Sequence, residues 1–150
     1  VLFSWTSMTY YMRTETYKEK SRDYVAAARI IGIEGIEQSK NIGKFFSQNN
    51  IKIDKVLSSE WCRCKHTAQH AFDKYETKSF LNSFFSAKFA NNKNKQIYDL
   101  KKYINEWNGD NNLVLVTHYV TIQEVLNISP SSGEIIISDK NFNVLARQNF

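Results

Sequence analysis

Two arginines and one histidine, Arg13, Arg63 and His118, stand where they could act together on a phosphate group. Each follows an apolar, strand-forming stretch, either directly or within about one helical turn. Guanidinium groups donate paired hydrogen bonds to phosphate oxygens and carry a permanent positive charge. The hydroxyl of Thr14, which follows Arg13, is a further candidate ligand. These four residues form the predicted phosphate-binding set.

Three predicted strands would bring this set together. Their expected ranges are Met8–Met12, Lys55–Leu57 and Leu113–Val116. The last is a continuous apolar run, which is typical of a strand buried on both faces of a parallel sheet. The carboxyl ends of parallel strands lie at one edge of the sheet, and ligands of open α/β sheets bind at that edge. The polar residues that follow the three strands are therefore expected to converge there.

Helices are predicted between the strands from the spacing of apolar residues. Their expected ranges are Gly32–Gln48, Glu60–Phe72, Gln96–Trp107 and Val120–Leu126. Gly43, inside the first helix, would allow close packing against a neighbouring element. Ser58 and Ser59 could cap the second helix, because a serine hydroxyl accepts from the free N–H groups of a helix start.

The order of elements predicts an α/β fold of three layers, with a mostly parallel central sheet flanked by helices and a C-terminal hairpin. Two segments are expected to be irregular: a loop over Thr14–Ala28 that could contain one helical turn, and a loop or broken helix over Ser83–Lys95. A short strand is expected at Phe80–Leu81, and the hairpin strands are expected at Glu134–Ser138 and Asn143–Arg147. A length of 150 residues suits a single domain over 1–150.

Composition narrows the classes of partner. A formal net charge of +5 and a pI of about 9.1 fit either an ordinary lysine-rich surface or attraction to an anionic substrate. We expect no nucleic-acid partner, because the basic residues form no long run and no basic–aromatic repeat. We expect no membrane span, because no apolar run reaches about 18 residues. Residues 1–11 lack the pattern of a signal peptide, and the choice between a cytoplasmic and an exported protein stays open.

Two pairs of potential metal ligands lie in one predicted helix. Cys62 and Cys64 are two positions apart and would point roughly 200° apart, so they are not expected to form a disulfide with each other. His66 and His70 are four apart on one face, but no third ligand with suitable spacing accompanies them. We therefore expect no metal site and no cofactor.

Several segments resemble the histidine phosphatase superfamily, which has the phosphoglycerate-mutase-like fold. Residues 58–68 read SSEWCRCKHTA and resemble the superfamily segment Ser-Ser-x-x-x-Arg-x-x-x-Thr-Ala. Residues 29–35 are similar to its Arg-x-Leu-Thr-x-x-Gly motif, with Gly32 in place of the threonine. Residues 115–118, LVTH, match the second-histidine motif, and Gly133-Glu134 resembles the Gly-Glu that follows it.

One departure from this pattern concerns the nucleophile. The first strand of the superfamily ends in Arg-His, and that histidine attacks phosphorus, but here Arg13 is followed by Thr14. A threonine hydroxyl does not replace imidazole as a phosphoryl acceptor without an added base. Either Thr14 has replaced the histidine, or a modified histidine such as phosphohistidine follows Arg13 and is absent from the one-letter sequence. The string Arg13-Thr14-Glu15-Thr16 fits the second alternative, because some members carry Arg-His-Thr-Glu-Thr.

The resemblance implies a phosphohydrolase that acts on a small phosphomonoester or a phosphohistidine protein through a phosphohistidine intermediate. Arg13, Arg63 and His118 would then hold the phosphoryl oxygens and stabilise the transition state. Arg29 could line the entrance to the site, and Glu15 or Glu134 could serve as the general acid. If the nucleophile is truly lost, the alternative is an inactive pseudophosphatase that binds phosphorylated small molecules or phosphoproteins.

Overall fold

A computed structural model describes residues 2–3 and 22–150, with side-chain surroundings from residue 33 onward. The strand predicted at Met8–Met12 lies outside the described residues, as do Arg13, Thr14 and Glu15. The helices are α2 (Arg22–Gln48), α3 (Cys62–Phe72), α4 (Lys93–Glu106) and α5 (Tyr119–Leu126), with short 3-10 turns η1 (Ser79–Leu81) and η2 (Ala90–Asn92). The strands are β1 (Leu2–Phe3), β2 (Ile53–Ser58), β3 (Glu76–Thr77), β4 (Asn112–Val116), β5 (Ile135–Ser138) and β6 (Val144–Gln148).

The strands form one sheet in the order β3-β2-β4-β1-β5-β6. The pairs β2–β3, β2–β4 and β1–β4 are parallel. The pairs β1–β5 and β5–β6 are antiparallel, and β5 and β6 form the C-terminal hairpin. The predicted α/β class, with parallel strands and a terminal hairpin, is therefore confirmed.

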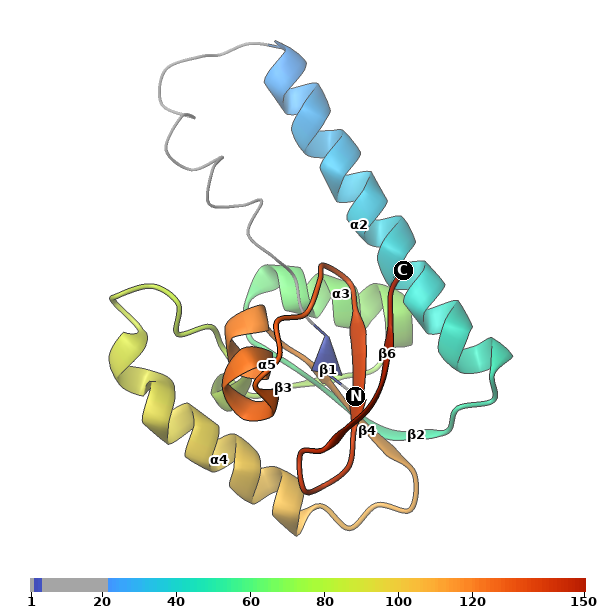
Figure 1. The fold of residues 1–150 in the computed structure, drawn as a ribbon. Helices are drawn as coiled ribbons and strands as arrows, with labels where there is room; N and C mark the ends of the chain where they lie inside the picture. Colours follow the sequence, from blue (N-terminus) through green and yellow to red (C-terminus); the bar gives the residue numbers. More distant parts are fainter. Residues whose placement is uncertain (1, 4–21) are drawn as a thin grey trace.

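Alternating residues of β4 supply two hydrophobic clusters. Val114 and Val116 belong to one cluster, whereas Leu115 belongs to the other. Because successive side chains of a strand point to opposite faces, the clusters lie on the two faces of the sheet. Helices α2 and α3 complete the first cluster, and α4 and α5 complete the second. Helices thus flank the sheet. The N-terminal half of α2 extends beyond the other helices and strands (Figure 1).

Three local predictions are wrong. Helix α2 begins at Arg22 rather than at Gly32, so the second half of the segment predicted as a loop, Thr14–Ala28, is helical. The alanines at 26–28 have the highest helix propensity of any residue and no proline interrupts them. Phe80–Leu81 forms part of the 3-10 turn η1 instead of a strand. Leu81 is fully buried there because it packs into the α4–α5 cluster. A short apolar pair can be buried in a turn as well as in a strand, so its composition alone does not separate the two.

Close packing between α2 and α3 depends on Gly43, as the sequence predicted. A Cβ atom built at Gly43 would stand 2.3 Å from the backbone oxygen of Ala71. Real Cβ atoms do not approach a carbonyl oxygen that closely, and a helix backbone has little freedom to move away. The glycine therefore sets the distance between these two helices.

We predict that Gly43→Ala lowers the free energy of unfolding by roughly 1–3 kcal/mol, because the added methyl group forces α2 away from α3. Equilibrium unfolding in urea measures the change. The matched control is Asn41→Ala on the same helix, where an exposed residue is replaced by a better helix former. If both variants are as stable as the parent, the close α2–α3 approach is incorrect.

Candidate functional site

The parallel pairing of β2 with β4 builds the site. Ser58 lies opposite Val116 at the carboxyl ends of the two strands. Just beyond them, the backbone N–H of Ser59 donates to the carbonyl oxygen of Val116 at 2.9 Å. Thr117 and His118 continue from Val116, so Ser59 and His118 emerge side by side at this edge. The predicted convergence of the second and third strand ends is therefore observed.

Arg63 and His118 contact each other directly. Arg63 lies in the first turn of α3, and its Nη2 is 3.0 Å from Nδ1 of His118. An arginine side chain only donates hydrogen bonds. Nδ1 must therefore be the unprotonated, accepting nitrogen, and the ring proton resides on Nε2. Two of the three residues predicted to meet at this edge are thus in hydrogen-bond contact.

The hydrogen-bond chain continues from the other side of the ring. Nε2 of His118 lies 3.0 Å from Oγ of Ser59, which in turn donates to Oδ1 of Asn82 at 2.8 Å. Because the Ser59 proton is used in that second bond, Ser59 accepts the Nε2 proton. Asn82 is fixed by Glu60, whose N–H donates to Asn82 Oδ1 and whose carboxylate accepts from Asn82 Nδ2 at 2.7 Å. One tautomer of His118 satisfies every bond in the chain.

Burial keeps His118 neutral. Only 1% of the residue is exposed. Desolvation and, to a smaller extent, the positive charge of Arg63 lower the pKa of His118 from 6.5 to about 3. The imidazole is therefore uncharged at neutral pH and serves as a fixed acceptor for Arg63.

Trp61 holds Arg63 and His118 from a third direction. Its ring meets that of His118 edge-on, with centroids 5.0 Å apart. The guanidinium carbon of Arg63 lies 5.2 Å from the centroid of the Trp61 ring. Such a cation–aromatic contact is attractive. The guanidinium is thus oriented both by an aromatic ring and by the Nδ1 acceptor before any ligand binds.

Cys64 is not suited to act as a nucleophile in this arrangement. Cys64 is buried, and its thiol donates weakly to the carbonyl oxygen of Thr117 at 3.7 Å. Burial raises the pKa of Cys64 to about 12, so the reactive thiolate does not form at neutral pH. Cys62 is exposed, and the two are not bonded to each other, as the helical spacing predicted.

Glu134, a candidate general acid, is occupied elsewhere. Its carboxylate accepts from Nε and Nη2 of Arg147 at 2.5 and 2.9 Å, and from the backbone N–H of Ser131 at 2.7 Å. The hydrogen bond from Arg147 holds the pKa of Glu134 below its usual range. A carboxyl group that stays ionised is a poor proton donor. This geometry favours a structural role, in which Glu134 ties β6 to the turn before β5.

Several predicted site residues are not placed by the structure. Arg13, Thr14 and Glu15 lie outside the described residues, and only the backbone of Arg29 is described, within α2. The roles of Asn82 and Trp61 in the site were not predicted from the sequence. Trp61 carried a signal, because it lies inside the segment that contains Arg63. No local sequence pattern pointed to Asn82, because its role comes from contacts between segments 22 or 23 residues apart.

Ser59 has a different role from the predicted one. The residue that caps α3 is Trp61, and it makes no side-chain capping bond. Ser59 instead accepts from the N–H of Trp61 at 3.3 Å, in the turn before the helix. Its hydroxyl is committed mainly to His118 and Asn82. Ser59 therefore serves the site rather than the helix end.

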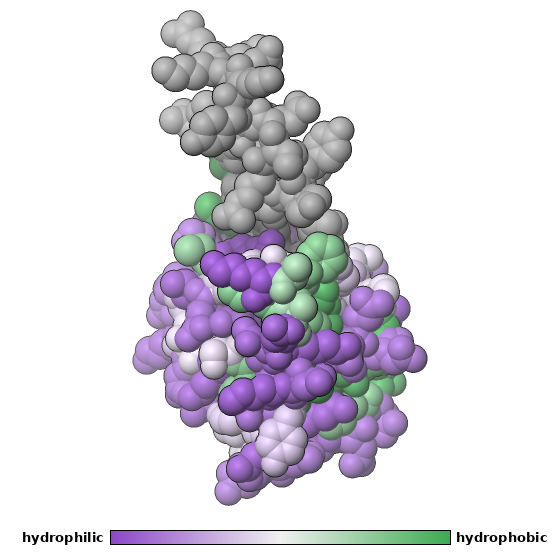
Figure 2. Space-filling view, turned by 90° about the vertical axis from the view of Figure 1, so that its left-hand side faces the viewer, coloured by the Kyte–Doolittle hydropathy of each residue, from purple (hydrophilic) through white to green (hydrophobic). Residues whose placement is uncertain are grey.

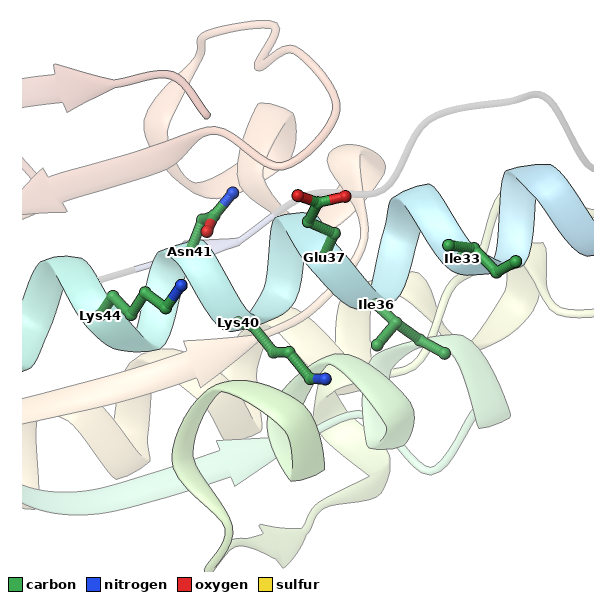
Figure 3. A pocket seen from close by; sticks show the side chains of 6 residues that line it. All are labelled: Ile33, Ile36, Glu37, Lys40, Asn41 and Lys44. Carbon is green, nitrogen blue, oxygen red and sulfur yellow. The ribbon is translucent and has the colours of Figure 1, made fainter.

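A surface hollow of about 350 Å³ lies along α2, away from these residues. Figure 3 shows its lining side chains, all of them on the helix itself: Ile33, Ile36, Glu37, Lys40, Asn41 and Lys44. The hollow carries charges of both signs and no histidine or cysteine. This chemistry is that of an exposed helix surface, so the candidate site remains the Arg63–His118 cluster.

Comparisons of the chain with protein-family models, with curated proteins and with solved structures found no match. Within residues 2–3 and 22–150, no cluster of three or more histidine, cysteine, aspartate or glutamate side chains is arranged to hold a metal ion. In the same part of the chain, no helix combines the length and hydropathy needed to cross a membrane.

We predict that His118 makes stability depend on pH. Its pKa is lower in the folded chain than the ordinary 6.5. Its contribution is therefore complete above about pH 6.5 and declines as the pH falls toward 3, because the unfolded chain takes up the proton first. When the pH is lowered from 8 to 5, the titration of His118 should lower the free energy of unfolding by roughly 2 kcal/mol.

Urea unfolding of the parent and of His118→Gln at both pH values measures this contribution. Glutamine does not titrate, so the variant should lose less stability than the parent by about that amount. Equal losses would show that His118 is not held neutral in the folded chain.

Proposed function

We propose that the chain is of histidine phosphatase type, with the three-layer fold of that superfamily, and that the Arg63–His118 cluster binds a phosphate group. The observation that carries the proposal is the hydrogen bond from Arg63 to His118 at the carboxyl edge of the sheet. It joins the two phosphate-binding positions that the superfamily motifs assign. As the sequence stands, the proposed function is that of a pseudophosphatase that binds phosphorylated small molecules or phosphoproteins.

Arg63 is the residue proposed to contact the phosphate. A guanidinium group offers five N–H donors in a rigid fork, and His118 uses one of them. Two N–H groups of such a fork can hold two phosphate oxygens together, which is the strongest arrangement for this pair. His118 and Trp61 act as positioning residues, because they fix the fork and reduce the entropy lost on binding.

Two helix starts add to the attraction. Helix α3 begins at Cys62 and α5 begins at Tyr119, next to Arg63 and His118 respectively. Helix N-termini carry partial positive charge and favour anions. The formal net charge of +5 acts in the same direction over a longer range. An anionic ligand therefore fits the edge of the sheet better than a neutral or cationic one.

The chain supplies no histidine suited to phosphoryl transfer. It contains three, of which His66 and His70 are exposed on α3, and His118 is committed to Arg63 and Ser59. Because none of these three histidines is suited to accept a phosphoryl group, the proposal favours phosphate binding over hydrolysis.

Hydrolysis is the second candidate, favoured by the string Arg13-Thr14-Glu15-Thr16 and its likeness to Arg-His-Thr-Glu-Thr. With a histidine after Arg13, a ring nitrogen would attack phosphorus while the ester oxygen leaves with a proton. Water would then attack the phosphohistidine, releasing phosphate and restoring the free imidazole. Arg63 would stabilise the charge that develops on the phosphoryl oxygens in both steps.

The proposed site predicts that the chain binds inorganic phosphate. Inorganic phosphate at about 100 times its dissociation constant should raise the stability of the parent by about 2.7 kcal/mol, because it binds only the folded chain. The rise is measured as a shift in Tm. Arg63→Ala should lose the shift, and Arg63→Lys should retain part of it, because lysine keeps the charge but not the fork.

The matched control is Lys40→Ala, which removes the same charge from the exposed surface of α2. This variant should respond to phosphate as the parent does. If Arg63→Ala also responds like the parent, the phosphate site is elsewhere and the proposal fails.

A second prediction separates binding from hydrolysis. A chain whose intact mass equals the printed sequence should not hydrolyse para-nitrophenyl phosphate. Insertion of one histidine between Arg13 and Thr14 should create this activity, and Arg63→Ala in the inserted chain should abolish it. Turnover by the mass-verified parent would contradict the pseudophosphatase assignment, and a silent insertion variant would contradict the histidine phosphatase assignment.

A further inference from the structure

Four aromatic side chains form two contacting pairs, one through Trp61, which touches His118, and one through Tyr119, which follows His118 in the chain. We call these four residues the aromatic rim: Trp61, Phe85, Phe89 and Tyr119. Two belong to the site elements, since Trp61 precedes α3 and Tyr119 opens α5. Phe85 and Phe89 come from the segment between η1 and α4. The rim therefore joins three separate parts of the chain at one edge of the sheet.

Ring contacts link the rim to the site. Trp61 meets His118 on one side and Phe89 on the other, with the Phe89 centroid 5.9 Å away. Phe85 packs against Tyr119, also at 5.9 Å, and Tyr119 is the residue directly after His118. Direct contact therefore joins the first pair to the cluster, and the chain itself joins the second pair to it.

Exposure distinguishes the rim from core packing. Phe85 is 62% exposed, although its neighbour Phe84 is buried. Phe89 and Trp61 are half-buried. Figure 2 looks onto the side that carries this segment and shows apolar surface gathered among hydrophilic surface near its upper edge. Leaving a phenyl ring in water is unfavourable, so a ligand that covers Phe85 would gain from its burial.

The charges of the same segment favour an anion. From Lys78 to Tyr98 the chain carries no acidic residue. Lys88 lies over the ring of Phe89, with its Nζ 5.6 Å from the centroid. The other lysines of this segment are engaged in ion pairs: Lys78 with Glu76, Lys93 with Glu124 and Lys95 with Asp99. An aromatic surface with a lysine beside it suits a ligand that is both aromatic and negatively charged.

We propose that the ligand is a phosphate ester of an aromatic alcohol, with its phosphate on Arg63 and its ring on the aromatic rim. This inference rests on the proposed function, since it uses the same site for the phosphate. An aryl ester places its ring directly beside the phosphate, as Trp61 lies directly beside Arg63 and His118. An alkyl ester of similar charge would leave Phe85 uncovered.

Calorimetric titration of the full chain with three dianions at pH 8 tests the inference: inorganic phosphate, ethyl phosphate and phenyl phosphate. Phenyl phosphate should bind about tenfold more tightly than ethyl phosphate, which is the effect of one or two well-placed aromatic contacts. Phe85→Ala should reduce the preference to about twofold and leave the affinity for inorganic phosphate unchanged. Tyr98→Ala removes a similarly exposed ring, 67% against 62%, from α4 and should keep the preference.

The outcomes separate the two claims. If all three anions bind alike, or if Phe85→Ala and Phe89→Ala both keep the preference, the inference is overturned while phosphate binding stands. If none of the anions binds, the proposed function fails and the inference fails with it. A phosphotyrosine tripeptide that binds at least as tightly as phenyl phosphate supports the inference and assigns the aryl group to a protein; weaker binding assigns it to a free ester.

Discussion

The burial of a neutral imidazole between a guanidinium and a hydroxyl is the constraint on which this site depends. His118 is almost fully buried, and both of its ring nitrogens are used, by Arg63 and by Ser59. An unpaired polar group in that position would cost free energy, whereas the paired one fixes three side chains at once. The guanidinium of Arg63 consequently has one orientation in the absence of a ligand, which is the condition for tight binding of an anion.

The fold provides this constraint through one pair of parallel strands. The register that sets Ser58 opposite Val116 also brings the first turn of α3 against the residues after β4. Val114 and Val116 pack into one core and Leu115 into the other, so a slip of one residue would exchange side chains of different size between two packed cores. Gly43 then allows α2 to lie close enough to α3 to complete the core beneath the site. Stability and binding geometry therefore share the same contacts.

Much of this could be predicted from the sequence, for identifiable reasons. The apolar run before His118 and the spacing of Arg63 after the second strand are local patterns, and they placed both residues at one edge. The tautomer of His118 and the role of Asn82 were not predictable, because they depend on contacts between distant segments. The ion pair that engages Glu134 was not predictable either, because its partner, Arg147, lies across the β5–β6 hairpin. The start of α2 was not predictable from Gly32, because glycine disfavours a helix interior, yet this residue lies within α2.

The most direct test of the central claim is side-chain ¹⁵N NMR of His118 and Arg63 during titration with inorganic phosphate. In the free chain, the His118 ring should be neutral, with its proton on Nε2 and with Nδ1 accepting from Arg63. Added phosphate should shift the signals of both residues together along one saturable curve. A protonated ring in the free chain at neutral pH, or signals that do not change with phosphate, would contradict the account.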